Sequence, residues 1–140
     1  MRRYVVDAAN QAAKRAPLTR REPVFKVLIL IKRKRGMSIE DFRRHYEESH
    51  APLAMRMVPN LKRYVRHYAA PYPDAASMPD IPCDVITEFG FDDRADFERG
   101  MAYIQDPERS PILVEDEERF IDRDSVRFFV IEDCETPIPG

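Results

Sequence analysis

The 140-residue chain has two cysteines, four glycines, no tryptophan and almost no net charge. The chain has 23 basic and 25 acidic residues, so it has no overall positive electrostatic field that would attract nucleic acid or an anionic membrane. Cys83 and Cys134 stand far apart and outside any metal-ligand spacing, which predicts free thiols in a reducing compartment. The longest apolar run, residues 27–31, is far below the about 20 residues that cross a bilayer, and no signal-peptide core follows Met1. We therefore expect a cytoplasmic protein with neither nucleic-acid nor membrane partners.

The composition is that of one ordinary globular domain. Hydrophobic residues make up 44% of the chain and charged residues 34%, which is enough apolar material for a packed core. We place this domain at residues 23–140. Residues 1–22 are rich in arginine and nearly free of acidic residues, so they predict a basic extension in which residues 4–16 permit a short helix. An organelle transit peptide is the alternative that this composition allows.

The expected elements follow the order strand, helix, strand, strand, helix, strand. Strands are predicted at residues 24–33, 61–68, 83–91 and 125–132. One helix runs from Ser38 to about His50, with Pro52 ending it or opening a further turn, and another follows Asp92 and Asp93. A short acidic helix is expected near residues 111–120, and the proline-rich residues 69–82 predict a loop. This order is that of a ferredoxin-like α+β fold, βαββαβ, an antiparallel sheet with helices on one face.

Both faces of the first predicted strand are apolar. One face carries Val24, Leu28 and Leu30, and the other carries Phe25, Val27, Ile29 and Ile31. Helices of a ferredoxin-like unit cover one face only, so the sheet of a second copy is the economical cover for the other. The pattern therefore predicts a homodimer in which two sheets face each other.

Four segments of the chain resemble the EthD family: residues 36–54, which end in His-Ala-Pro-Leu, residues 60–68, residues 83–93 and residues 116–126. The resemblance implies a dimeric α/β barrel with a pocket between sheet and helices in each protomer. It also implies a role in the breakdown or biosynthesis of small organic molecules, with oxidoreductase, decarboxylase-like or dehydratase-like chemistry. Tyr46 stands where the family pattern has tryptophan, and Asn60 where it has glycine.

His50 is the best candidate for proton transfer. An unperturbed histidine titrates near pH 6.5, and His50 lies at a predicted helix end beside Pro52, in line with Phe42 and Tyr46. One interpretation is a general acid or base that faces an apolar pocket. The other is a histidine that bonds a helix-end carbonyl and holds the turn. We place Tyr46 and Asp84 beside His50 as the further catalytic candidates.

Strand residues supply most of the substrate-binding candidates. His67 shares a predicted strand face with Leu61 and Val65, which indicates either a pocket wall or a satisfied core or interface histidine. Asp84, which matches an acidic position of the EthD pattern, and Glu88 share a face of the third strand. Each can orient a histidine or act as a base, or else pair with Lys62, Arg63 or Arg66. The substrate-binding candidates are His67, Phe42, Tyr64, Leu53 and Glu88.

No metal or redox cofactor is predicted. His45 and His50 stand five residues apart, so on an α-helix they face different sides, and His45 is expected to be solvated and without a role. The chain has no glycine-rich phosphate loop and no HExxH or GxSxG motif.

The sequence thus favours two functions. The first is an EthD-type enzyme, an oxidoreductase or a lyase or isomerase. It would transfer a proton without a cofactor during oxidation, dehydration, isomerisation or decarboxylation of an apolar aromatic or polyketide-like compound. The alternative is a non-catalytic protein that binds such a compound, or an accessory protein for a partner oxygenase.

Overall fold

The computed structural model describes residues 25–140. The basic extension at residues 1–22, the helix expected at residues 4–16 and Val24 lie outside the described residues. Of the described residues, 25–131 belong to one compact unit, and residues 132–140 contain no helix or strand.

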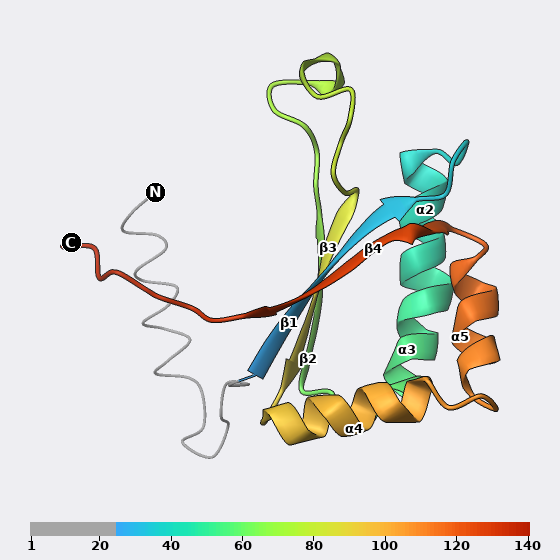
Figure 1. The fold of residues 1–140 in the computed structure, drawn as a ribbon. Coiled ribbons are helices and arrows are strands. Elements are labelled where there is room, and N and C mark those ends of the chain that lie inside the picture. The colour runs from blue at the N-terminus through green and yellow to red at the C-terminus, as the bar shows by residue number, and fades with distance from the viewer. Residues whose placement is uncertain (1–24) are drawn as a thin grey trace. The chain divides into compact units, whose positions relative to one another are not determined.

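Four antiparallel strands form one sheet in the order β2-β3-β1-β4 (Figure 1). The strands are β1 (Phe25–Arg33), β2 (Arg63–Tyr68), β3 (Val85–Phe91) and β4 (Ile121–Ile131). This order confirms the predicted ferredoxin-like α+β fold. β4 begins earlier than the sequence predicts, because Ile121 and Asp122 already pair with Arg33 and Lys32. The register shifts between Leu30 and Lys32, where Ser125 Oγ accepts a hydrogen bond from the Lys32 N–H at 3.0 Å.

Helices α2 (Ile39–His45), α3 (Ala51–Met57) and α5 (Ser110–Glu117) lie on one side of the sheet, and α4 (Arg94–Ile104) runs across its end (Figure 1). Both expected N-caps are present, since Ser38 accepts from the Asp41 N–H and Asp93 from the Asp96 N–H. The loop predicted at residues 69–82 contains only the short 3₁₀ helix η2 (Ala75–Ser77). No helix among the described residues has the length and apolar character that spanning a membrane requires.

A π-helical turn, η1 (Tyr46–His50), joins α2 to α3, so that one helix continues through residues 39–57. The Ala51 N–H donates to the Tyr46 carbonyl, five residues back. Pro52 accounts for this turn, because proline has no N–H and its ring clashes with the carbonyl four residues earlier in a regular α-helix. Of the two outcomes expected at Pro52, the further turn is therefore confirmed: the helix widens at η1 and continues as α3.

The core lies between the helices and the inner face of the sheet. Val27, Ile29 and Ile31 of β1 are buried there, as the alternation predicts. Phe42 and Phe120 are completely buried, with ring centroids 5.6 Å apart. These rings pack α2 against the residue that precedes β4.

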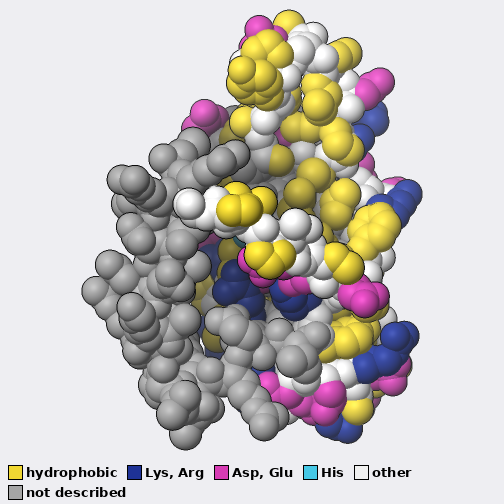
Figure 2. Space-filling view, turned by 90° about the vertical axis from the view of Figure 1, so that its left-hand side faces the viewer, with side chains coloured by type: hydrophobic (Ala, Val, Ile, Leu, Met, Phe, Trp, Pro, Cys, Tyr) yellow, Lys and Arg dark blue, Asp and Glu magenta, His cyan; other side chains and the backbone are white. Residues whose placement is uncertain are grey.

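The outer face of the sheet carries Leu28 and Leu30 of β1, which are only partly buried. Strand register places Phe129 of β4 and Glu88 of β3 on either side of Leu28. On this side of the molecule, the described residues present hydrophobic side chains among basic and acidic ones (Figure 2).

Replacing Phe42 with alanine should lower the free energy of unfolding by about 3–5 kcal/mol, because the change removes a fully buried ring from the contact with Phe120. Urea unfolding measures this loss. Ile39→Ala is the matched control on the same helix, because Ile39 is 55% exposed and its loss should change stability by less than about 0.5 kcal/mol. Equal effects of the two changes would contradict the core described above.

Candidate functional site

A cavity of about 240 Å³ lies between the helices and the inner face of the sheet. Its walls are mainly apolar and include Ile29, Val58, Phe89, Leu113 and Phe120. Polar side chains that reach it include Tyr46, His50, Tyr64, Gln105, Glu117 and Arg123. A concave, mainly apolar space with a few polar groups is typical of small-molecule sites.

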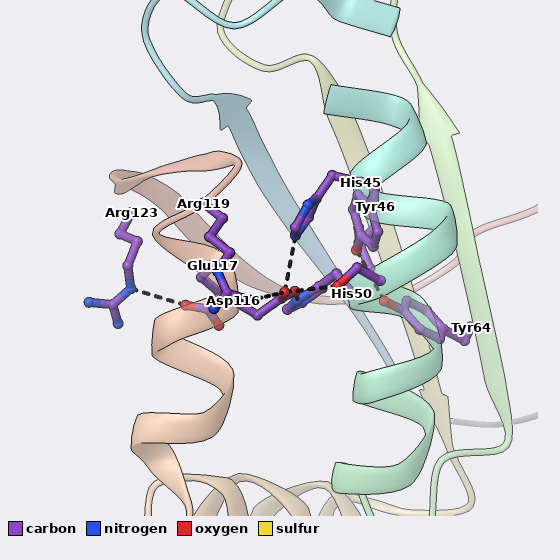
Figure 3. A network of polar contacts seen from close by, with 10 residues as sticks. His45, Tyr46, His50, Tyr64, Asp116, Glu117, Arg119 and Arg123 are labelled. Atoms are coloured by element: carbon purple, nitrogen blue, oxygen red, sulfur yellow. Dashed lines mark hydrogen bonds and ion pairs between the residues drawn. The ribbon is translucent and has the colours of Figure 1, made fainter. Parts of the chain in front are cut away.

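His50 lies at the cavity wall, at the last residue of the π-turn. Its Nδ1 lies 2.9 Å from Oδ2 of Asp116, on the facing helix α5 (Figure 3). A carboxylate can only accept, so Nδ1 carries the proton and Nε2 keeps its lone pair. Among the described residues Nε2 has no hydrogen-bond partner, which leaves it able to accept a proton from a ligand.

Asp116 is a buried carboxylate with a donor on each oxygen. Ser49 Oγ donates to Oδ1 at 2.9 Å, and His45 Nε2 lies 3.1 Å from the same oxygen. Burial on its own would raise the pKa of Asp116, but the hydrogen bonds from His50 and Ser49 and the nearby histidines outweigh it and hold that pKa below its usual value. Asp116 is therefore ionised when it holds His50.

The expectation that His45 is solvated is wrong. Both His45 and His50 contact Asp116, and the Phe120 ring packs against both, with centroids 4.7 and 4.9 Å away. The cause is η1, whose turn closes over five residues instead of four and so brings two positions five apart onto one side.

Burial is the main influence on His50 and lowers its pKa. The hydrogen bond to Asp116 and the charge of Glu117 act in the opposite direction without cancelling that effect. The imidazole is therefore neutral near pH 7, which is the form that accepts a proton.

A chain of three hydroxyl groups lies beside this histidine. The Tyr46 hydroxyl is 2.6 Å from Thr87 Oγ1 of β3, and the Tyr64 hydroxyl contacts the Tyr46 hydroxyl at 3.3 Å. Burial raises the pKa of both tyrosines, so both remain neutral phenols that donate hydrogen bonds. Tyr46 and Tyr64 both line the cavity with His50.

Of the residues that the sequence proposed, His50, Tyr46 and Tyr64 meet at the cavity. Phe42 packs behind Tyr46 in the core, with ring centroids 6.3 Å apart, and does not line the cavity. Leu53 lies at a separate surface hollow with Ser49 and Asp116.

Asp84, Glu88 and His67 lie away from the cavity. The Asp84 carboxylate accepts the Arg33 N–H at 2.8 Å at the strand end. Glu88 pairs with Arg63, as the alternative interpretation of that residue predicted, and lies 3.5 Å from His67 Nε2. Glu88 and His67 lie on the outer face of the sheet. Side chains alternate along a strand, and on the inner face of β2 the contacts with Tyr46 and Glu47 are made by Tyr64, Arg66 and Tyr68.

Asp116, Thr87, Glu117 and Arg123 were not among the predicted site residues. Asp116 is the first residue of the segment 116–126 that resembles the EthD pattern, and this was the one available signal. Glu117 lines the cavity and accepts a hydrogen bond from Arg123 Nε at 3.0 Å. Within residues 25–140, no three His, Cys, Asp or Glu side chains are grouped to hold a metal ion.

Comparison with known proteins identifies the fold and the domain. The EthD domain model matches residues 34–124, more than half of the chain. Among solved structures, the chain is similar to an EthD family protein from Bacillus halodurans C-125, with 18% identity and a TM-score of 0.55 over 79% of this chain and 99% of that one. It is also similar to HapK from Hahella chejuensis, with 13% identity and a TM-score of 0.51 over 83% of this chain and 98% of that one. No curated protein matches.

Replacing Asp116 with asparagine should lower the pKa of His50 further, because Asp116 raises that pKa while burial, which lowers it, remains. An NMR titration of the His50 ring protons measures the change. Glu115→Gln is the control, since Glu115 is an exposed neighbour on the same helix, and it should leave the titration unchanged. A rise in the His50 pKa in Asp116→Asn would show that the carboxylate does not act as described.

Stability should also depend on the protonation of His50. The native pKa of His50 lies below the value of about 6.5 in the unfolded chain, so below that pH the unfolded chain binds more protons. We expect the free energy of unfolding to decrease as the pH falls from about 6.5 through the native pKa, and this component to vanish in His50→Gln. Urea unfolding of the wild type and of His50→Gln at a series of pH values tests this.

Proposed function

The chain belongs to the EthD family, and on that premise we propose an enzyme of small-molecule metabolism in which His50 removes a proton from an apolar aromatic or polyketide-like compound. One observation carries this proposal. His50 lines a mainly apolar cavity, and one of its ring nitrogens is bonded to a buried carboxylate while the other has no hydrogen-bond partner among the described residues.

Asp116 supports the base in two ways. Its hydrogen bond at 2.9 Å fixes the tautomer in which Nε2 is the acceptor. Its negative charge also stabilises the imidazolium that forms when Nε2 takes up a proton, and a histidine paired with a buried aspartate performs this function in unrelated hydrolases.

In the proposed step, Nε2 takes a proton from an acidic C–H or O–H group of the substrate. The electron pair of the broken bond stays on the substrate as an enolate or phenolate. Return of the proton to another atom gives an isomerisation, and its delivery to a departing hydroxyl gives a dehydration. An oxidation, in which dioxygen accepts the electrons, can follow from the same anion. In a decarboxylation the order is reversed: CO₂ leaves, its bonding electrons stay on the substrate as an enolate, and a protonated His50 returns a proton to that enolate. The step itself uses only residues of this chain.

The cavity limits the size of the substrate. Its volume of about 240 Å³ is below the about 300–1,000 Å³ of drug-sized sites, so it suits a compound of one or two rings. Aromatic side chains of Tyr64, Phe89 and Phe120 line it and favour a flat, apolar ring.

We further propose a cytoplasmic homodimer. The support for a dimer is the outer sheet face, where Leu28 and Leu30 are only partly buried and Phe129 is half exposed. The unpaired thiols of Cys83 and Cys134 suit a reducing compartment.

The test follows deuterium uptake from D₂O into a panel of small 1,3-dicarbonyl and hydroxyaromatic compounds. The wild type should accelerate the exchange, and His50→Gln should lose about 10²–10⁴-fold of that rate because the base is gone. His67→Gln is the matched control and should keep the rate, since His67 lies on the outer face. If the wild type binds panel compounds but exchanges none, the non-catalytic binding or oxygenase-accessory alternative replaces the proposed enzyme.

A further inference from the structure

Thr87 has no part in the base chemistry above, although it lies at the centre of the inner sheet face. It is 1% exposed, and its hydroxyl makes a short contact of 2.6 Å with the Tyr46 hydroxyl. Tyr46 is itself almost fully buried, and its hydroxyl continues to that of Tyr64 at 3.3 Å. The three hydroxyl groups therefore form a line from Thr87 of β3 to Tyr64 of β2, and both tyrosines of this line also line the cavity.

The two links of this line differ in strength. The Thr87–Tyr46 contact has the length of a good O–H···O hydrogen bond, whereas the Tyr46–Tyr64 contact is longer than the usual 2.5–3.0 Å. Tyr64 makes no other hydrogen bond within the described residues. Its proton can thus turn from Tyr46 to a ligand oxygen while Tyr46 donates to Tyr64 in its place.

We propose that the Tyr64 hydroxyl donates a hydrogen bond to the oxyanion that forms on the substrate, and that Thr87 positions Tyr64 through Tyr46. This inference rests on the proposed function, because the oxyanion forms when His50 takes the substrate proton. Tyr64 is then a catalytic residue, Tyr46 a link, and Thr87 a positioning residue.

A cation strengthens the donor. The Arg66 guanidinium lies 4.7 Å from the centre of the Tyr64 ring and 5.9 Å from that of Tyr46, and two hydrogen bonds to Glu47 hold it there. The positive charge of Arg66 favours negative charge at the end of the hydroxyl line, and its effect on Tyr64 is larger than the opposing effect of Glu47. This matters because the nearby Asp116 and Glu117 are acidic and oppose an anion in the cavity.

The probes are 4-nitrophenol, which ionises to an oxyanion, and 4-nitrotoluene, which has nearly the same shape but no hydroxyl. The wild type should bind 4-nitrophenol more tightly than 4-nitrotoluene in a titration at pH 8. Tyr64→Phe should weaken 4-nitrophenol about tenfold or more and leave 4-nitrotoluene unchanged, because only the donor is lost. Tyr103→Phe, at a tyrosine of α4 outside the cavity lining, is the matched control and should bind both probes like the wild type.

A separate pair of variants tests whether Thr87 positions Tyr64. Thr87→Val keeps the shape of the side chain and removes the hydroxyl, so it should reduce the preference for 4-nitrophenol, and Thr87→Ser should restore it. If Thr87→Val does not fold, Tyr46→Phe breaks the same line one link later. A reduced preference that serine fails to restore overturns the positioning role.

Two results separate this inference from the proposed function. If Tyr64→Phe weakens both probes equally or neither, or if the wild type binds both alike, the oxyanion site is overturned, whatever the deuterium exchange shows. If the preference depends on Tyr64 and yet the wild type exchanges no deuterium, the oxyanion site stands and the proton-transfer function fails.

Discussion

Pro52 cannot donate a backbone hydrogen bond, and its ring needs the space that the carbonyl four residues earlier would occupy in an α-helix. The helix through residues 39–57 meets both conditions by widening at Tyr46–His50. That single turn places His45 and His50 on the same carboxylate while Tyr46 still points into the core. With a regular helix here, the two histidines would diverge, and Asp116 would hold at most one of them.

The chemistry of His50 follows from two opposing influences on one ring. The apolar cavity disfavours the imidazolium, and Asp116 favours it. Burial outweighs the carboxylate, so the resting ring is neutral and can accept a proton. When His50 accepts a proton, Asp116 stabilises the imidazolium, because a carboxylate oxygen lies 2.9 Å from Nδ1, which shares the new positive charge. A histidine in the same cavity without the carboxylate would be a much weaker base.

The sequence was sufficient for the fold because alternation and capping are local signals. Val27, Ile29 and Ile31 mark the inner face of β1, and Ser38 and Asp93 mark the helix starts. The site was harder to predict. In β2 the inner face carries the charged residue Arg66, which is stable there because Glu47 pairs with it. Since a charged residue is expected on the solvent side of a strand, the pattern of β2 favoured the other face as the pocket wall, and His67 was predicted to bind substrate there. Asp116 stands in the acidic run at residues 115–118, where only tertiary contact distinguishes one carboxylate from the next.

Polar groups on the inner face are compatible with an apolar cavity only when they are paired with one another. Thr87, Tyr46 and Tyr64 form one such set, and Arg66 with Glu47 forms another. Within residues 25–140, no fully buried side-chain nitrogen or oxygen lacks a hydrogen-bond partner. A ligand in the cavity therefore meets few groups that are ready to change partner. The lone pair on His50 Nε2 and the weakly held proton of Tyr64 are two of these, one an acceptor and the other a donor, which is the combination that removing a proton and holding the resulting anion requires.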